Sequence, residues 1–192
     1  PDGITWVTVR RVLRNNSAAG ASHAELDVRL SDGTDAVLHI TPEANVPGVF
    51  RVELEVPDAL REEPGESAVV WSWVDLHAPE GENYYGLGEV FHSVAHRGQK
   101  IAMHMVFMEN EGASNEAHVR VPLLVSNAAW GVFANSKRPG YFDVADDDPE
   151  RIRVIFHDSA LQWYLMAAPE PLAITEQYTA LTEKPAIPPV WA

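Results

Sequence analysis

Residues 49–56 read Val-Phe-Arg-Val-Glu-Leu-Glu-Val, and from the second residue onward apolar and charged side chains alternate without a break. This alternation is typical of a β-strand with one face in a protein core and the other in water. Residues 24–30 alternate in the same way, the turn-forming sequence Ser-Asp-Gly-Thr occupies 31–34, and residues 36–40 continue as a partner strand. The first third of the chain therefore predicts neighbouring antiparallel strands.

Similar patterns recur along the chain. Further strand candidates are residues 6–11, 67–74, 100–107, 117–125, 129–135, 151–157 and 160–166. Short, evenly spaced strands separated by turn signals favour an antiparallel sandwich or barrel. We therefore expect an all-β fold, an antiparallel β-sandwich.

One segment near the carboxyl end has helical spacing instead. Ile174, Tyr178 and Leu181 lie at positions i, i+4 and i+7, after the sequence Pro-Glu-Pro at 169–171. Proline and an acidic residue suit the first turn of a helix, and the helix should end before Pro185. The sequence predicts a β-sandwich domain at residues 1–168. Residues 169–192 should form a connector helix with a proline-rich lead into something beyond the chain.

Composition excludes several function classes. The chain of 192 residues holds 14 Lys and Arg, 28 Asp and Glu, and no cysteine, for a formal net charge of −14. The missing cysteines exclude a disulfide scaffold, a thiolate zinc site and a cysteine nucleophile. The acidic balance argues against nucleic acid as a partner, and no apolar run approaches the ~20 residues of a membrane span. We therefore expect neither nucleic acid nor a membrane as a partner. The absence of a signal-like segment slightly favours the cytoplasm and leaves the compartment open.

Metal and cofactor sites find little support. His92 and His96 are four residues apart, which could place two ligands on one helical face, but glycines interrupt this segment and no third ligand has a recognisable spacing. Loop or core histidines are the simpler interpretation. Residues 143–150 are rich in acid but lack the spacing and central glycine of a calcium loop, so a solvated acidic loop is favoured. We expect no metal and no cofactor.

Carboxylates are the next candidates, because glycosidases place two of them on either side of the bond they cleave. Glu89, Glu109 and Glu111 lie in loop-like segments near aromatic residues. Their spacing does not show that any two of them converge, and a solvated loop acid is the simpler interpretation of each.

Six tryptophans are present. Flat indole rings stack on sugars, but they also fill the cores of β-sandwiches. Trp71, Trp130 and Trp163 lie within strand patterns, which favours the core for these three.

Several motifs occur in a fixed order from residue 85 onward. Residues 85–89 read Tyr-Gly-Leu-Gly-Glu, residues 121–124 read Val-Pro-Leu-Leu, and residues 130–133 read Trp-Gly-Val-Phe. Residues 178–191 follow the pattern Tyr-x-x-Leu-Thr-x-x-Pro-x-Ile-Pro-Pro-x-Trp. In this order they resemble glycoside hydrolase family 31, which includes α-glucosidases and α-xylosidases. The final run is the most specific part.

The resemblance implies a fold for this chain and a separate catalytic domain. In that family this stretch is the amino-terminal β-sandwich, related in fold to galactose mutarotases, and it leads into a catalytic (β/α)8 barrel. The family's aspartate nucleophile and aspartate acid lie in the barrel, so the resemblance implies no catalytic residue in this chain. Its implied role is to dock on the barrel of a retaining α-glycosidase, whose substrate is an α-linked carbohydrate.

The resemblance also implies a contribution to the substrate pocket. In the family a loop with a Trp-Asn-x-Asp pattern reaches over the barrel mouth. Counting back from Pro122 aligns its aspartate with Glu109, and Glu111 is the second candidate, whereas Val106 and Phe107 replace the aromatic residue and the asparagine. We expect Glu109 and Glu111 to be substrate-binding residues in an exposed loop.

Two other functions stay open. A mutarotase-like aldose epimerase would use a histidine acid, His92 or His96, with Glu89 as the base. A free-standing carbohydrate-binding module would bind sugar without any barrel.

Overall fold

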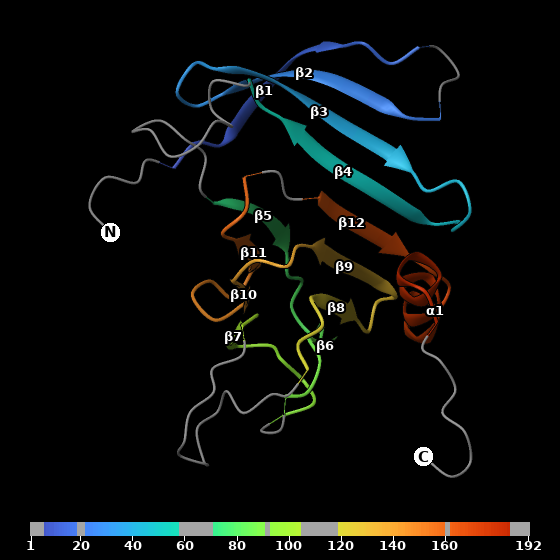
Figure 1. The fold of residues 1–192 in the computed structure, drawn as a ribbon. Helices are drawn as coiled ribbons and strands as arrows, with labels where there is room; N and C mark the ends of the chain where they lie inside the picture. Colours follow the sequence, from blue (N-terminus) through green and yellow to red (C-terminus); the bar gives the residue numbers. More distant parts are fainter. Residues whose placement is uncertain are drawn as a thin grey trace.

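The computed structural model describes residues 6–18, 22–57, 71–90, 93–104, 119–159 and 162–184. Within these residues it consists of two β-sheets and one helix, α1, which lies beside the larger sheet (Figure 1). Every strand pair recorded in the two sheets is antiparallel. The all-β, antiparallel sandwich predicted from the sequence is confirmed.

The two sheets differ in size. The larger sheet has eight strands, in the order β1 (Val9–Asn15), β2 (Ala24–Leu30), β3 (Asp35–Pro42), β4 (Val49–Glu55), β12 (Gln162–Ala167), β9 (Trp130–Asn135), β8 (Leu123–Ser126) and β6 (Tyr84–Gly86). The smaller sheet has four, in the order β5 (Ser72–His77), β11 (Arg151–Phe156), β10 (Gly140–Val144) and β7 (Gln99–Ala102).

The strands with clean alternation are where the sequence predicts them, and the exceptions are short or irregular. The first strand begins at Val9 rather than at residue 6, and two register shifts interrupt its pairing with β2. The strands β6 and β10 are not among the sequence-based candidates. β6 has only three residues, and β10 begins with a glycine and carries Asp143 at its fourth position. Neither offers an alternation long enough to recognise.

The main core lies where the smaller sheet faces β12, β9, β8 and β6. Fully buried side chains from both sheets meet there, among them Tyr84, Leu124, Val132, Phe142, Ile152, Val154 and Phe156. Trp163 also belongs to this core and is 7% exposed, whereas Trp130 is partly buried against it and Trp71 is half-buried outside it. The sequence therefore places Trp163 correctly, and Trp130 in part.

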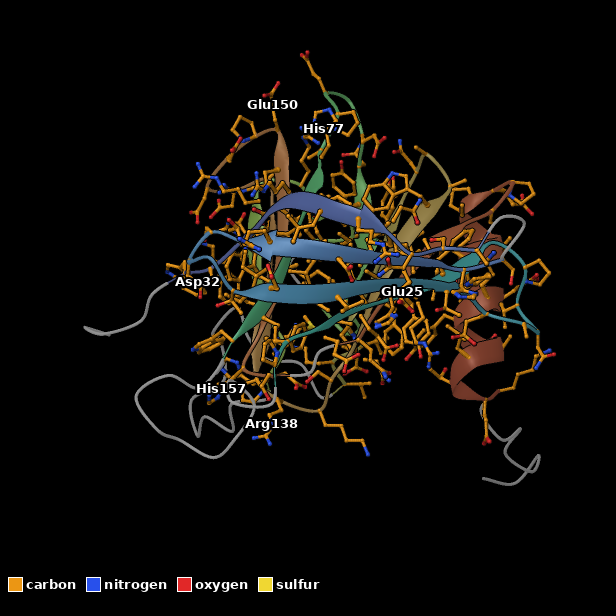
Figure 2. The ribbon with its side chains drawn as sticks, turned by 90° about the horizontal axis from the view of Figure 1, so that it is seen from above. Glu25, Asp32, His77, Arg138, Glu150 and His157 are labelled. Carbon is orange, nitrogen blue, oxygen red and sulfur yellow. The ribbon has the colours of Figure 1, made fainter. Side chains whose placement is uncertain are left out.

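Strands β1 to β4 extend the larger sheet beyond this core. Their inner face carries a separate apolar cluster, built on Val28, Leu30, Ala36 and Val56. Figure 2 looks down on these strands and shows the strands of the smaller sheet crossing beneath them. His77 and Glu150 mark one end of the crossing strands, and Arg138 and His157 mark the other (Figure 2). The larger sheet thus extends beyond the sandwich core through β1 to β4.

The helix α1 (Pro171–Thr182) packs on the outer face of the larger sheet. Ile174 is its one buried residue and contacts a cluster from β8, β9 and β12, while Tyr178 and Leu181 are partly buried beside it. A Cβ atom built on Gly131 of β9 would lie 2.8 Å from the Ile174 Cγ2 atom, so a glycine at this position allows the helix to approach the sheet closely. The predicted apolar stripe is therefore the packing face of the helix.

The ends of the helix agree with the sequence, with one adjustment. Glu170 is the N-cap residue, with an extended backbone, and it lies just outside the first turn in which we expected it. Glu183 caps the carboxyl end at a φ of 70°, a conformation that costs free energy for any residue other than glycine.

Candidate functional site

A turn rich in glycine follows β6 and has an unusual backbone. Gly86, Leu87 and Gly88 have φ values of 104°, 62° and 82°, so three consecutive residues adopt the left-handed region. A Cβ atom on Gly86 would collide with the carbonyl oxygen of Leu123. One on Gly88 would collide with the carbonyl oxygen of Val119 and lie 2.8 Å from the Val121 nitrogen. Gly86 and Gly88 are therefore both required by close backbone packing.

Backbone hydrogen bonds attach this turn to the segment that leads into β8. The Leu87 nitrogen donates to the Leu123 carbonyl at 2.9 Å, and the Glu89 nitrogen donates to the Val119 carbonyl at 2.9 Å. The Leu87 side chain is fully buried, whereas that of Glu89 is exposed. The turn thus fixes residue 119, where the chain returns from the segment that holds Glu109 and Glu111.

The carboxylate of Glu82 lies in the loop that precedes β6. One oxygen of Glu82, Oε2, accepts hydrogen bonds from the Ser126 hydroxyl at 2.7 Å and from the Trp130 indole nitrogen at 3.1 Å. The pKa of Tyr84 is raised to about 12, chiefly by burial and also by the neighbouring Glu82 carboxylate, while Arg97 acts in the opposite direction. These contacts tie the loop before β6 to β8 and β9.

Arg97 joins three loops through hydrogen bonds to backbone carbonyl groups. Its guanidinium donates to the carbonyl oxygens of Ala78, Pro79, Glu82 and Pro149, at distances from 2.7 to 3.3 Å. A guanidinium used in this way satisfies backbone acceptors that would otherwise be left without donors. Its role in this region is to hold the loops in place.

The two sequence-predicted substrate-binding residues cannot be placed. Glu109 and Glu111 lie outside the described residues. Their assignment as substrate-binding residues stays a prediction.

The histidine interpretation is confirmed for His96. Its side chain is 2% exposed, and its Nε2 atom lies 3.0 Å from the carbonyl oxygen of Gly86. His96 is therefore a core histidine that supports the glycine-rich turn. His104 is exposed, and His92 and His118 lie outside the described residues. Among the described residues there is no group of three or more His, Cys, Asp or Glu side chains that could hold a metal ion.

The acidic segment at residues 143–150 is only partly the solvated loop that the sequence favours. Asp143 is 2% exposed and belongs to β10, and its carboxylate accepts hydrogen bonds from the backbone nitrogens of Asp146 and Asp147. Lys100 lies 3.7 Å from it. A buried carboxylate is tolerated here because it is paired and hydrogen-bonded.

Sequence reasoning gave no role to Glu82 or to the Arg97 guanidinium. Glu82 contacts residues that lie 44 and 48 positions away in the sequence, so no local sequence pattern predicts these contacts.

Within the described residues, no helix is long and apolar enough to span a membrane.

Comparison with known proteins identifies the domain. A family model described as the glycosyl hydrolase 31 N-terminal galactose mutarotase-like domain matches residues 21–143. An alpha-xylosidase of Emericella nidulans is 28% identical over 123 residues, which cover 64% of this chain and 15% of that protein. The alpha-xylosidase XylQ of Lactiplantibacillus pentosus is 28% identical over 112 residues, which cover 58% of this chain and 14% of that protein.

A solved structure shares the fold over almost the whole chain. The cycloalternan-forming enzyme from Listeria monocytogenes superposes with a TM-score of 0.80 at 16% identity, over 98% of this chain and 23% of that one. The matched region thus spans less than a quarter of each of these proteins. On the match to residues 21–143, the chain belongs to the glycosyl hydrolase 31 N-terminal galactose mutarotase-like domain family.

Proposed function

We propose that this domain is the non-catalytic amino-terminal part of a retaining α-glycosidase, in which a (β/α)8 barrel hydrolyses α-linked sugars. The observation that carries this proposal is the family match over residues 21–143, together with α-xylosidase relatives of which the matched region is only 14–15%. The catalytic carboxylates of the retaining reaction would come from the barrel.

The outer side of α1 is the proposed docking surface. Ile174 anchors the helix to the sandwich with no exposed surface, whereas Leu172 of the same helix is 69% exposed. Full burial of a leucine side chain is worth about 1.5–3 kcal/mol, so a barrel that covered Leu172 would gain stability from the contact. An exposed apolar side chain on a fixed helix supports this surface as an interface.

The segment that holds Glu109 and Glu111 is the proposed contribution to the pocket rim. It leaves after β7 and returns at Val119, whose carbonyl is held by the Glu89 nitrogen at 2.9 Å. An acidic side chain at the rim would orient sugar hydroxyl groups without taking part in bond cleavage.

The epimerase alternative loses support at one of its two proposed acids. The ring of His96 is 2% exposed and its Nε2 atom is engaged with the Gly86 carbonyl, so it is not available to a sugar. An epimerase would then depend on His92 with Glu89.

Activity assays test the proposal directly. The chain alone should not turn over aryl α-glucosides or α-xylosides, whereas the protein that carries both this domain and its barrel should. Turnover that scales with the purified chain and survives a second purification would refute the non-catalytic role.

Variants of the barrel-bearing protein test the pocket rim. Glu109→Ala should raise KM or lower kcat by about tenfold or less, because a rim contact positions sugar without making or breaking the bond. Glu80→Ala, at an exposed position, is the matched control and should change neither constant. A loss at Glu109 as large as that of a nucleophile variant would mean that its role is catalytic.

A further inference from the structure

The outer face of the smaller sheet carries aromatic and charged side chains, of which Ile155 and Asp143 are buried, at 4% and 2% exposed, whereas the adjoining Trp6 is 53% exposed. Because side chains alternate along a strand, the residues between the core positions point away from the larger sheet. The core positions are Val74 and Leu76 on β5, Ile152, Val154 and Phe156 on β11, Phe142 and Val144 on β10, and Ile101 on β7. The intervening residues form two rows across the sheet, and the pair of Arg151 and His77 begins a third.

The first row is aromatic and apolar. The register places Trp73 opposite Ile155, Ile155 opposite Tyr141, and Tyr141 opposite Ala102. Trp6, which precedes β1, extends this row. The residue is 53% exposed, and its ring stands at 89° to the Trp73 ring, with the centroids 5.0 Å apart. The indoles of Trp6 and Trp73 are thus perpendicular to each other, and Trp6 is accessible to solvent.

The second row is charged and alternates in sign. Asp75 lies opposite Arg153, Arg153 opposite Asp143, and Asp143 opposite Lys100. Both nitrogens Nε and Nη2 of Arg153 donate to the Asp75 carboxylate at 2.7 Å, and the Lys100 ammonium lies 2.7 Å from Asp147. The four side chains of the row sum to zero charge, in a chain whose formal net charge is −14.

The two rows touch each other. The Arg153 guanidinium lies 5.9 Å from the centroid of the Trp73 ring, and the Lys100 ammonium lies 5.7 Å from that of Tyr141. Aromatic surface is thus immediately beside fixed hydrogen-bond donors and acceptors. This combination suits a ligand with an apolar face and a rim of hydroxyl groups.

We propose that this face, built from Trp6, Trp73 and Tyr141 with Asp75 and Arg153, binds a neutral α-linked oligosaccharide. The C–H face of a sugar ring would stack on the open Trp6 indole, and neighbouring hydroxyl groups would reach the Asp75–Arg153 pair. Because the charges of the row cancel, the face has no excess of cations to attract an anionic polymer. The α-linkage rests on the proposed function, whereas the surface itself requires no barrel.

Binding to the chain alone tests the site. We would titrate it with maltohexaose and isomaltohexaose by calorimetry and by saturation-transfer NMR, with sulfated dextran as the charged comparison. At least one neutral oligosaccharide should bind saturably, and Trp6→Ala should weaken that binding by about tenfold, as for an aromatic anchor in other interfaces. Trp6→Phe should restore part of the affinity.

Two exposed apolar positions elsewhere supply the controls. Phe50→Ala and Leu172→Ala, at residues that are 41% and 69% exposed, should bind sugar like the unaltered chain. Circular dichroism would show that each variant is folded, and NMR on the unaltered chain gives a readout that needs no variant. Loss of sugar binding would leave the activity of a barrel-bearing protein on small aryl glycosides intact, which separates this proposal from the proposed function.

Three outcomes would overturn the proposal. The first is no saturable binding of either neutral oligosaccharide, and the second is equal binding of sulfated dextran. The third is a dimer, seen by sedimentation velocity, that Trp6→Ala dissociates while sugars show no effect, since the face would then be a contact between two copies of the chain.

Discussion

Replacing Ile174 by alanine should remove the main attachment of α1 to the sandwich. The Ile174 side chain has no exposed surface and packs in a cluster with Val49, Leu123, Phe133 and Met166. The cluster rests on the larger sheet, and the hydrogen bonds between its strands limit how far it can collapse into the space left by the shorter side chain. The truncation should therefore leave a cavity as well as remove apolar contacts.

The expected magnitude follows from that geometry. Large-to-small substitutions of buried isoleucine cost about 2–5 kcal/mol, and the higher values occur where the surroundings cannot collapse. The Gln177 amide still holds the helix through the carbonyl oxygens of Pro47 and Ala167, at 2.8 and 3.0 Å, so the helix keeps a second attachment. We expect a loss near the middle of the range, about 3 kcal/mol.

Urea denaturation provides the assay, with far-UV circular dichroism and tryptophan fluorescence recorded on the same samples. Leu172→Ala is the matched control, because it truncates a residue of the same helix that is 69% exposed, and it should change stability by about 0.5 kcal/mol or less. Ile174→Val should fall between the two, at a loss of about 0.5–1.5 kcal/mol.

The reasoning fails if Ile174→Ala and Leu172→Ala cost the same. A cost for Ile174→Ala below about 1 kcal/mol would equally show that the helix contributes little to the folded domain. If the ellipticity of the variant falls before its fluorescence changes, the helix unfolds as a separate unit, and the free energy belongs to its docking rather than to global unfolding.

Two further predictions concern the loop before β6. Glu82→Ala should destabilise the domain by about 1–3 kcal/mol, because the buried Ser126 hydroxyl and the Trp130 indole lose their acceptor. Glu82→Gln keeps an acceptor oxygen and should cost less. Urea denaturation of both variants measures the difference between their free energies of unfolding. The pKa of Tyr84 is raised from 10.0 to about 12, chiefly by burial, so the unfolded chain releases this proton first and stability should fall as the pH rises from 10 towards 12. Tyr84→Phe should flatten that decline, and denaturation midpoints at a series of pH values would show whether it does.

The strands with one face in the core could be predicted from the sequence, because a single face in water imposes alternation residue by residue. The segments 24–30, 36–40 and 49–56 coincide with β2, β3 and β4 for this reason. The helix can also be predicted from the sequence, because Ile174, Tyr178 and Leu181 all lie on the side that packs on the sheet. Local patterns were sufficient where burial follows the period of the backbone.

The charged row on the smaller sheet could not be predicted in this way. Asp143 appears in the sequence as the first of a run of acids, yet it is buried because β10 brings it between Arg153 and Lys100. The Asp75–Arg153 pair joins residues 78 positions apart. Such pairing depends on the register between distant strands, which no local pattern contains.

The proposed docking surface on α1 and the proposed sugar-binding face lie on opposite sides of the sandwich, and this has a functional consequence. The helix α1 covers the outer face of the larger sheet, through the cluster that includes Phe133 and Ile174. Trp6, Trp73 and Tyr141 belong to the outer face of the smaller sheet, with the main core between the two. A barrel docked on the exposed side of α1 would therefore leave the aromatic face open to solvent. If both proposals hold, the same domain would bind an oligosaccharide on one face while its other face contacts the proposed barrel.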